Sequence, residues 1–245
     1  MRTREPSIRP LTSFHHVIWD WNGTLLDDAW LCVEVMNGLL AARGLPVLTR
    51  ESYREQFDFP VIDYYRRLGF DFDREPFEVV GTEFIETYER RRHESALQPG
   101  AGEVLQEVRD SGVGQSVLSA YRQETLEELI GHFGLRRFFS GLVGLDNHYA
   151  HSKVENGVRW IGELGLPPAE VLMIGDSSHD HEVAEAMGVE CWLLTNGHHA
   201  AAKLRALKVP VFDSLLELGV ASGLWETAPD GTAGRPDSGR DDLSL

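Results

Sequence analysis

Cysteine and long apolar runs are scarce in this 245-residue chain. Its two cysteines, Cys32 and Cys191, lie far apart in apolar surroundings. A disulfide framework is therefore not expected, and we expect two buried thiols in a reducing compartment. No segment has the apolar length of a membrane span, and residues 1–12 lack the apolar stretch of a signal peptide. The chain is therefore predicted to be cytoplasmic.

Positive charge is also in short supply. Lysine and arginine number 23 against 39 aspartates and glutamates, which gives a formal net charge of −16. Such a surface repels nucleic acid and anionic membranes, so neither is expected as a partner. An anionic substrate would need local positive charge or a metal ion. The length suits one large α/β domain or a core with a smaller domain, as a monomer or homodimer.

Strand and helix patterns alternate from Pro99 onward. Buried strands are expected at 115–119, 142–145, 171–174, 191–194 and 209–212. Helices are expected between them at 102–112, 122–133, 152–164, 179–187 and 199–207. With the first strand at 17–19, this alternation predicts an α/β fold, a doubly wound parallel sheet with helices on both faces.

Residues 27–98 interrupt this sheet after its first strand. Apolar residues recur there at helical spacing, at 30–40 and again at 77–88. The sequence therefore predicts an all-helical insert at 27–98 within a core formed by 13–26 and 99–222. The ends, 1–12 and 226–245, are predicted to be disordered, the latter because it is rich in Gly, Pro, Asp and Ser.

Polar side chains stand where the predicted strands end. Asp20 follows the first strand, Ser119 ends the second, and Asp176 and Asp180 follow the most apolar strand. Lys153 opens a helix. Because the carboxyl ends of parallel strands meet at one edge of a sheet, these groups are expected to converge.

The grouping suits phosphate chemistry. A carboxylate that attacks a phosphate dianion meets strong repulsion, which Mg²⁺ held by carboxylates would neutralise. Asp20, Asp176 and Asp180 would supply hard oxygen ligands. Lys153 would add fixed positive charge, and the Ser119 hydroxyl and backbone N–H groups after Asp20 could cradle the phosphoryl oxygens.

In this order the motifs resemble the haloacid dehalogenase superfamily of hydrolases. They are DWNGTL with Asp20, VLSA with Ser119, Lys153, and GDSSHD with Asp176 and Asp180. The helical insert resembles the small cap of phosphoglycolate-phosphatase-like members. The resemblance implies an aspartyl-phosphate at Asp20, with Asp20, Asp176, Asp180 and the backbone carbonyl of Asn22 as Mg²⁺ ligands. It also implies phosphoryl or substrate contacts from Thr24, Ser119, Ala120, Arg122 and Lys153, and a small phosphorylated metabolite as the partner.

Asn22 departs from the family pattern, in which an aspartate at this position exchanges the proton of the leaving alcohol. An amide cannot do so near neutral pH. A phosphatase with a substitute group remains the leading hypothesis, and Asn22→Asp is expected to raise turnover of poor leaving groups. The histidines considered as substitutes are His16, His148, His151, His179 and His181.

Four alternatives involve a different reaction or none. Phosphonate cleavage needs a cap lysine, and residues 27–99 contain none. Dehalogenation needs no metal, and phosphoryl return in a mutase needs the missing acid, so both are disfavoured. A phospho-ligand-binding protein with little turnover stays open.

The insert offers side chains that could read the leaving group, although each is also typical of a solvated face or of the core of the insert. They are Arg50, Arg54, Tyr64, Tyr65, Arg66, Arg67, Arg90, Arg91, Arg92 and His93. Trp21, beside Asp20, is expected to shape the pocket wall. The sequence thus predicts Mg²⁺-dependent hydrolysis of a small phosphate monoester.

Overall fold

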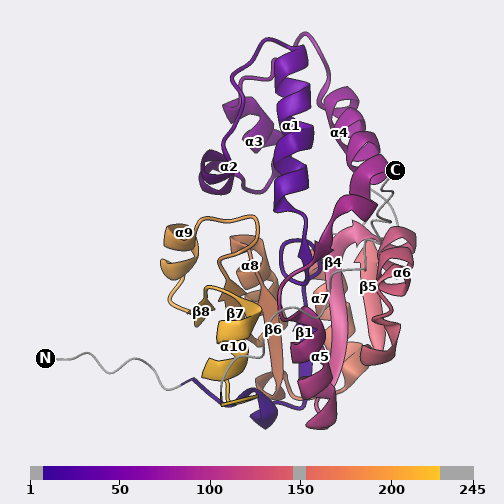
Figure 1. Cartoon of the computed structure of the whole chain (residues 1–245), viewed down its shortest axis with the longest axis vertical. Helices are drawn as coiled ribbons and strands as arrows, with labels where there is room; N and C mark the ends of the chain where they lie inside the picture. The colour runs from indigo at the N-terminus through magenta and orange to yellow at the C-terminus, as the bar shows by residue number, and fades with distance from the viewer. Residues whose placement is uncertain (1–7, 146–152, 227–245) are drawn as a thin grey trace, which may run out of the picture.

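The computed structural model describes residues 8–145 and 153–226. The expected disorder at residues 1–7 and 227–245, together with His148 and His151, lies outside the described residues. A six-stranded parallel sheet forms the centre of the molecule, in the order β5-β4-β1-β6-β7-β8 (Figure 1). Its strands are β1 (His16–Trp19), β4 (Gly114–Arg122), β5 (Gly141–Leu145), β6 (Val171–Gly175), β7 (Glu190–Leu194) and β8 (Val211–Phe212). The sheet grows outward from β1 in both directions, so the predicted α/β class is confirmed.

Helices cover both faces of this sheet. One face packs against α5 (Ala101–Asp110), α6 (Gln123–His132) and α10 (Leu215–Ala221). The other packs against α7 (Lys153–Leu164), α8 (Ser178–Met187) and α9 (Ala201–Arg205). Because side chains alternate along a strand, Val17 and Trp19 join the first of these cores and Ile18 the second.

Some boundaries differ from the sequence expectations. Strand β4 does not end at Ser119 but continues to Arg122, with a register shift after Leu118. Helix α9 begins at Ala201, so His199 lies in the preceding loop. The expected disorder of residues 1–12 is wrong for Leu11, which opens a 3₁₀ turn (Leu11–Ser13) and is fully buried. Its burial in the core outweighs the polar composition around it.

A lobe of four helices stands beyond one end of the sheet (Figure 1). It contains α1 (Ala29–Ala42), α2 (Arg50–Gln56), α3 (Val61–Arg67) and α4 (Phe77–Arg91), which share a hydrophobic core of their own. The insert is not helical throughout, because β2 (Leu26–Asp27) and β3 (Ala96–Leu97) pair antiparallel where the chain enters and leaves the lobe. Strands this short carry no period-2 pattern that a sequence could reveal.

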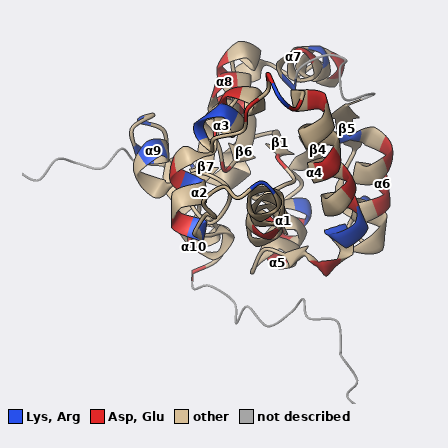
Figure 2. Cartoon of the chain, turned by 90° about the horizontal axis from the view of Figure 1, so that it is seen from above, with Lys and Arg blue, Asp and Glu red and all other residues tan. Residues whose placement is uncertain are grey.

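In the view from above, the ribbon positions of Lys and Arg and those of Asp and Glu are interspersed along the helices (Figure 2). None of the helices in the described ranges is long and apolar enough to cross a membrane.

Candidate active site

Asp20 lies directly after β1 and is 6% exposed. Its carboxylate accepts a hydrogen bond from Lys153 Nζ, which also donates to Asp180 Oδ1. Burial alone would lower the pKa of Lys153, but the Asp180 and Asp20 carboxylates raise it above its usual value. The lysine is therefore a fixed cation at the position where α7 begins, as the sequence suggested.

Asp180 is held by the turn that joins β6 to α8. Ser177 caps α8, and its hydroxyl and backbone N–H both donate to Asp180 Oδ2, at 2.7 and 3.0 Å. The N–H of Asp176 donates to the same oxygen. Burial raises the pKa of Asp180, yet Lys153 and these hydrogen bonds bring it down to about 2. Asp180 thus holds Lys153 and the turn in place.

Asp176 faces a tight backbone cradle. Its Oδ1 accepts from the Thr24 hydroxyl at 3.0 Å, and its Oδ2 accepts from the backbone N–H of His198 at 2.6 Å. A Cβ on Gly23 or Gly197 would lie 2.4 or 2.1 Å from this Oδ2, and Gly23 also has a φ of +82°. Only glycine fits at these two positions.

The carboxylates of Asp20, Asp176 and Asp180 form one buried cluster whose ligand oxygens lie within 4.8 Å of one another. Burial raises the pKa of Asp20 well above its usual value and that of Asp176 to about 6, and neighbouring carboxylates add to both shifts. A divalent cation would relieve this repulsion, and carboxylate oxygens are the ligands that Mg²⁺ prefers. The residues present therefore fit a magnesium ion.

The Asn22 side chain is held away from this cluster. Its Nδ2 donates to Asp28 Oδ2 at 2.8 Å and to the Tyr88 hydroxyl at 3.1 Å, while that hydroxyl donates to Asp28 at 2.7 Å. The amide thus ties the first motif to α1 and α4 of the helical lobe.

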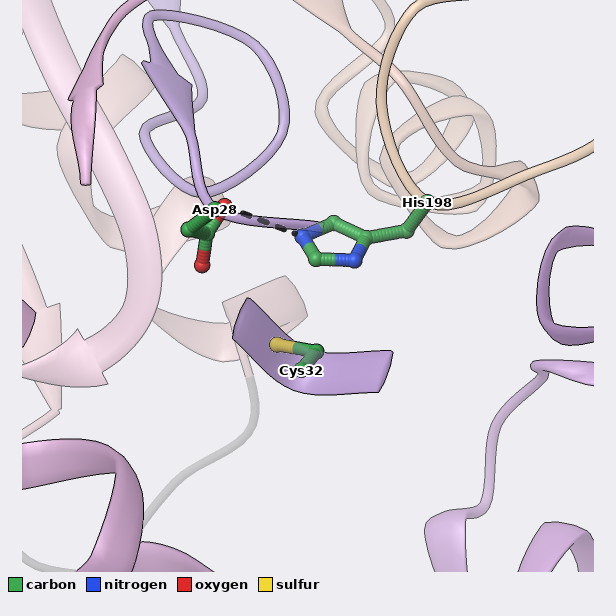
Figure 3. A group of neighbouring side chains, drawn as sticks. All are labelled: Asp28, Cys32 and His198. Atoms are coloured by element: carbon green, nitrogen blue, oxygen red, sulfur yellow. Dashed lines mark ion pairs between the residues drawn. The ribbon is translucent and has the colours of Figure 1, made fainter. Parts of the chain in front are cut away.

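His198, which the sequence analysis did not single out, points its ring toward Asp28 (Figure 3). Its Nε2 lies 3.3 Å from Asp28 Oδ1, and its Nδ1 lies 2.9 Å from the Tyr53 hydroxyl. Burial would lower the pKa of His198, but Asp28 raises it to about 9. Cys32 lies beside His198 and Asp28, and the three side chains are close enough to hold a metal ion. Because both ring nitrogens of His198 already have partners, we interpret Asp28 and His198 as an ion pair instead. The sequence could have indicated His198 by its position shortly after β7, because the carboxyl end of that strand lies at the same edge of the sheet as Asp20.

A cavity of about 1030 Å³ joins the carboxylate cluster to the helical lobe. Asp20, Lys153 and Asp176 line its floor, and α1–α4 supply most of the rest of its wall. Ala120 and Arg122, two of the candidate substrate-binding residues, line the cavity, and Arg122 is paired to Glu124.

Other predicted residues lie elsewhere. Thr24 and Ser119 do not line the cavity. The Thr24 hydroxyl donates to Asp176, and Ser119 Oγ accepts a hydrogen bond from the Tyr121 N–H at 3.1 Å. Trp21 does not shape the pocket wall, since it is fully buried in the core beneath the sheet face.

Of the described candidate histidines, one lines the cavity and two do not. His179 lines the cavity, with its ring centroid 4.7 Å from that of Phe59. His16 lies at the opposite end of β1 from Asp20 and bonds to Ser116, and His181 pairs with Glu185.

Most lobe arginines already have partners. Arg54 joins the lobe to the sheet domain by donating to the carbonyls of Gly197 (2.8 Å) and Asn196 (2.5 Å). The others and His93 bond within the lobe or to nearby helices: Arg50 to Asp27, Arg66 to Asp63, Arg67 to the Gln56 carbonyl, Arg91 to Glu34 and Glu94, Arg92 to Glu89 and Glu128, and His93 to Glu128. Tyr64 and Tyr65 belong to the lobe core and also line the cavity.

The sequence is similar to those of known proteins. The family model described as haloacid dehalogenase-like hydrolase matches residues 17–194. The phosphoglycolate phosphatase of Pseudomonas savastanoi pv. phaseolicola is 26% identical over 191 residues, covering 75% of this chain and 70% of that protein. The tyrosine-protein kinase PtkA of Mycobacterium tuberculosis is 26% identical over 76% of this chain and 63% of its own length.

Solved structures of other proteins have a similar fold. A haloacid dehalogenase-like family protein from Streptococcus pneumoniae superposes with a TM-score of 0.74 at 18% identity, covering 88% of this chain and 100% of that one. That likeness shows the fold alone. The structure of M. tuberculosis Protein Tyrosine Kinase A gives a TM-score of 0.72 at 27% identity, over 86% of this chain and 99% of that one.

Proposed function

The chain belongs to the haloacid dehalogenase-like hydrolase family, and we propose that it is a phosphatase that hydrolyses small phosphate monoesters with Mg²⁺. The observation that carries this proposal is the buried arrangement of Asp20, Lys153, Asp176 and Asp180 at the carboxyl edge of the sheet. The named relatives that include phosphoglycolate phosphatases support the same reaction class. Cys32 and Cys191 are both free thiols, which supports a cytoplasmic location.

Each residue has a distinct part in the proposed reaction. Asp20 attacks phosphorus, the P–O bond to the alcohol breaks, and an aspartyl-phosphate forms that water then hydrolyses. Lys153 holds Asp20 in place and offsets the charge that develops on the phosphoryl oxygens. When held by Asp20, Asp176, Asp180 and the Asn22 carbonyl, Mg²⁺ would supply further positive charge.

The proton of the leaving alcohol does not come from Asn22, whose amide is engaged with Asp28 and Tyr88. General acid catalysis is worth about 10²–10⁴-fold, so of two esters that bind equally well, the one whose alcohol leaves more readily as an anion should react faster. A protein that had lost catalysis would not need the bonds that hold Lys153 between Asp20 and Asp180. This network favours the phosphatase over the phospho-ligand-binding alternative.

The test is release of inorganic phosphate from a panel of monoesters, with Mg²⁺ and with EDTA. We expect Mg²⁺-dependent release that Asp20→Asn abolishes. Asp110→Asn, at the end of α5, is a matched control and should retain activity. Release that persists in Asp20→Asn would overturn the mechanism. Stabilisation by phosphate esters without any release would favour the binding protein.

A further inference from the structure

The wall of the cavity beyond the carboxylates is strongly apolar. Its lobe side is formed by aromatic and aliphatic side chains from α1, α3 and α4 and from the segment after α2. These include Met36, Phe57, Phe59, Tyr65, Phe84 and Ile85. At about 1030 Å³ the cavity is at the upper end of the range for small-molecule sites. A two-carbon acid would leave most of it to water.

Among the described residues, the basic side chains that line the cavity already have partners on the protein's own side chains. The pairs are Lys153 with Asp20 and Asp180, Arg122 with Glu124, His179 with Glu182, His198 with Asp28, and Arg90 with Thr87. Arg90 has a neutral partner, but it lies one helical turn from Glu86, which also lines the cavity. Within residues 8–145 and 153–226, a second acidic group on a substrate would therefore meet no lining basic side chain that lacks a nearby carboxylate.

The same wall carries negative charge. Glu78, Glu86 and Glu89 of α4 all line the cavity. A carboxylate on the leaving group would approach these side chains, whereas an uncharged chain would lie against the neighbouring aromatic rings. Burial of apolar area on binding is favourable in proportion to the area covered.

We propose that the alcohol part of the substrate is apolar and uncharged and occupies the aromatic lobe side of the cavity while its phosphoryl group lies at Asp20. This inference rests on the proposed phosphatase function. It separates the chain from the relatives named for phosphoglycolate, whose leaving group carries a carboxylate.

The test is a series of n-alkyl phosphates from methyl to hexyl, compared with phosphoglycolate in the presence of Mg²⁺. The longer alcohols of this series have closely similar pKa values, so chain length changes mainly the buried area. We expect kcat/KM to rise by about fourfold for each buried methylene, and to be lowest for phosphoglycolate. A flat or falling series, or a preference for phosphoglycolate, would overturn the inference and leave the phosphatase intact.

A pair of variants on α4 locates the effect. Ile85 is 37% exposed and lines the cavity, whereas Val79 is 52% exposed and is not among the lining residues. Ile85→Asp should lower kcat/KM for hexyl phosphate at least tenfold with little change for methyl phosphate. Val79→Asp adds the same charge to the same helix and should leave both unchanged. Equal losses for the two esters in Ile85→Asp would contradict the assigned place of the alkyl chain.

A binding measurement separates the two proposals. If no ester releases phosphate, the phosphatase proposal fails, and thermal stabilisation by each alkyl phosphate then tests the cavity alone. Stronger stabilisation by hexyl than by methyl phosphate, lost in Ile85→Asp, would support the apolar site. Equal stabilisation by the two would overturn it.

Discussion

Asn22 and Asp28 form one unit, and their identities depend on each other. Asn22 Nδ2 donates to Asp28 Oδ2, which also accepts from Tyr88. An aspartate at position 22 would place a second carboxylate against Asp28, close to the buried His198. The earlier expectation that Asn22→Asp raises turnover therefore needs a companion change.

We predict that Asn22→Asp alone lowers the stability of the protein by about 1–3 kcal/mol, because a hydrogen bond becomes a like-charge contact. The double variant Asn22→Asp/Asp28→Asn restores an amide–carboxylate pair but removes the carboxylate that pairs with His198, so it should recover only part of the loss. Denaturant melts of the wild type, Asn22→Asp, Asp28→Asn and the double variant give the coupling energy between the two positions. Additive losses would show that the two positions are independent.

His16, which lies far from the carboxylate cluster, should make the stability of the protein depend on pH. Burial lowers the pKa of His16 to about 4, and its Nε2 lies 2.8 Å from Ser116 Oγ. The unfolded chain binds this proton near pH 6.5. The neutral ring therefore contributes stability that is present above pH 6.5 and is lost as the pH falls toward 4.

We expect the stability difference between the wild type and His16→Gln to shift by roughly 1–3 kcal/mol between pH 7 and pH 4, in favour of the variant at the acid end. Urea melts at several pH values measure it. A difference that does not change with pH would show that His16 is protonated equally in both states.

At the scale of elements, helix α7 carries two glycines with opposite surroundings. A Cβ on Gly157 would lie 2.9 Å from Met187 Sδ and 3.1 Å from Leu118, whereas a Cβ on Gly162 would meet nothing within 4 Å. Gly157 thus allows α7 to pack closely on α8 and β4. Gly162 only weakens the helix.

Gly162→Ala should stabilise the protein by about 0.5–1 kcal/mol, and Gly157→Ala should destabilise it by about 1–3 kcal/mol through overpacking. Each kcal/mol corresponds to roughly 2–4 °C in Tm for a chain of this size. Equal shifts in both variants would mean that α7 tolerates a wider separation from α8.

At the scale of the whole molecule, the lobe and the sheet domain meet over the carboxylate cluster. Arg54 and Tyr53 of α2 contact the loop after β7, and the backbone of that loop bonds to Asp176. A cation at the cluster therefore acts on a junction that both parts share.

Mg²⁺ at about 100 times its Kd should raise Tm by roughly 5–10 °C, which corresponds to about 2.7 kcal/mol. Asp176→Asn should abolish this rise, and EDTA should reverse it. An equal rise with sodium chloride at the same ionic strength would indicate screening of the −16 net charge rather than a bound ion.

The sequence by itself determined the parallel sheet and the meeting of four polar groups. Apolar runs mark the strands, and the carboxyl ends of parallel strands must share an edge, so Asp20, Asp176 and Asp180 had to approach one another. Lys153 was placed by the start of its helix. These inferences needed only periodicity and local sequence.

Tertiary structure alone decided which side chains face the cavity and which are turned away. His198 meets Asp28 because the loop after β7 packs against the start of α1, and no local pattern encodes that contact. Ser119 and Thr24 carry hydroxyls in the expected places, but their hydrogen bonds direct them to Tyr121 and Asp176. The apolar wall likewise exists only because separate lobe helices bring their aromatic rings over the sheet edge. Side-chain direction depends on partners distant in sequence, and only the folded chain brings those partners together.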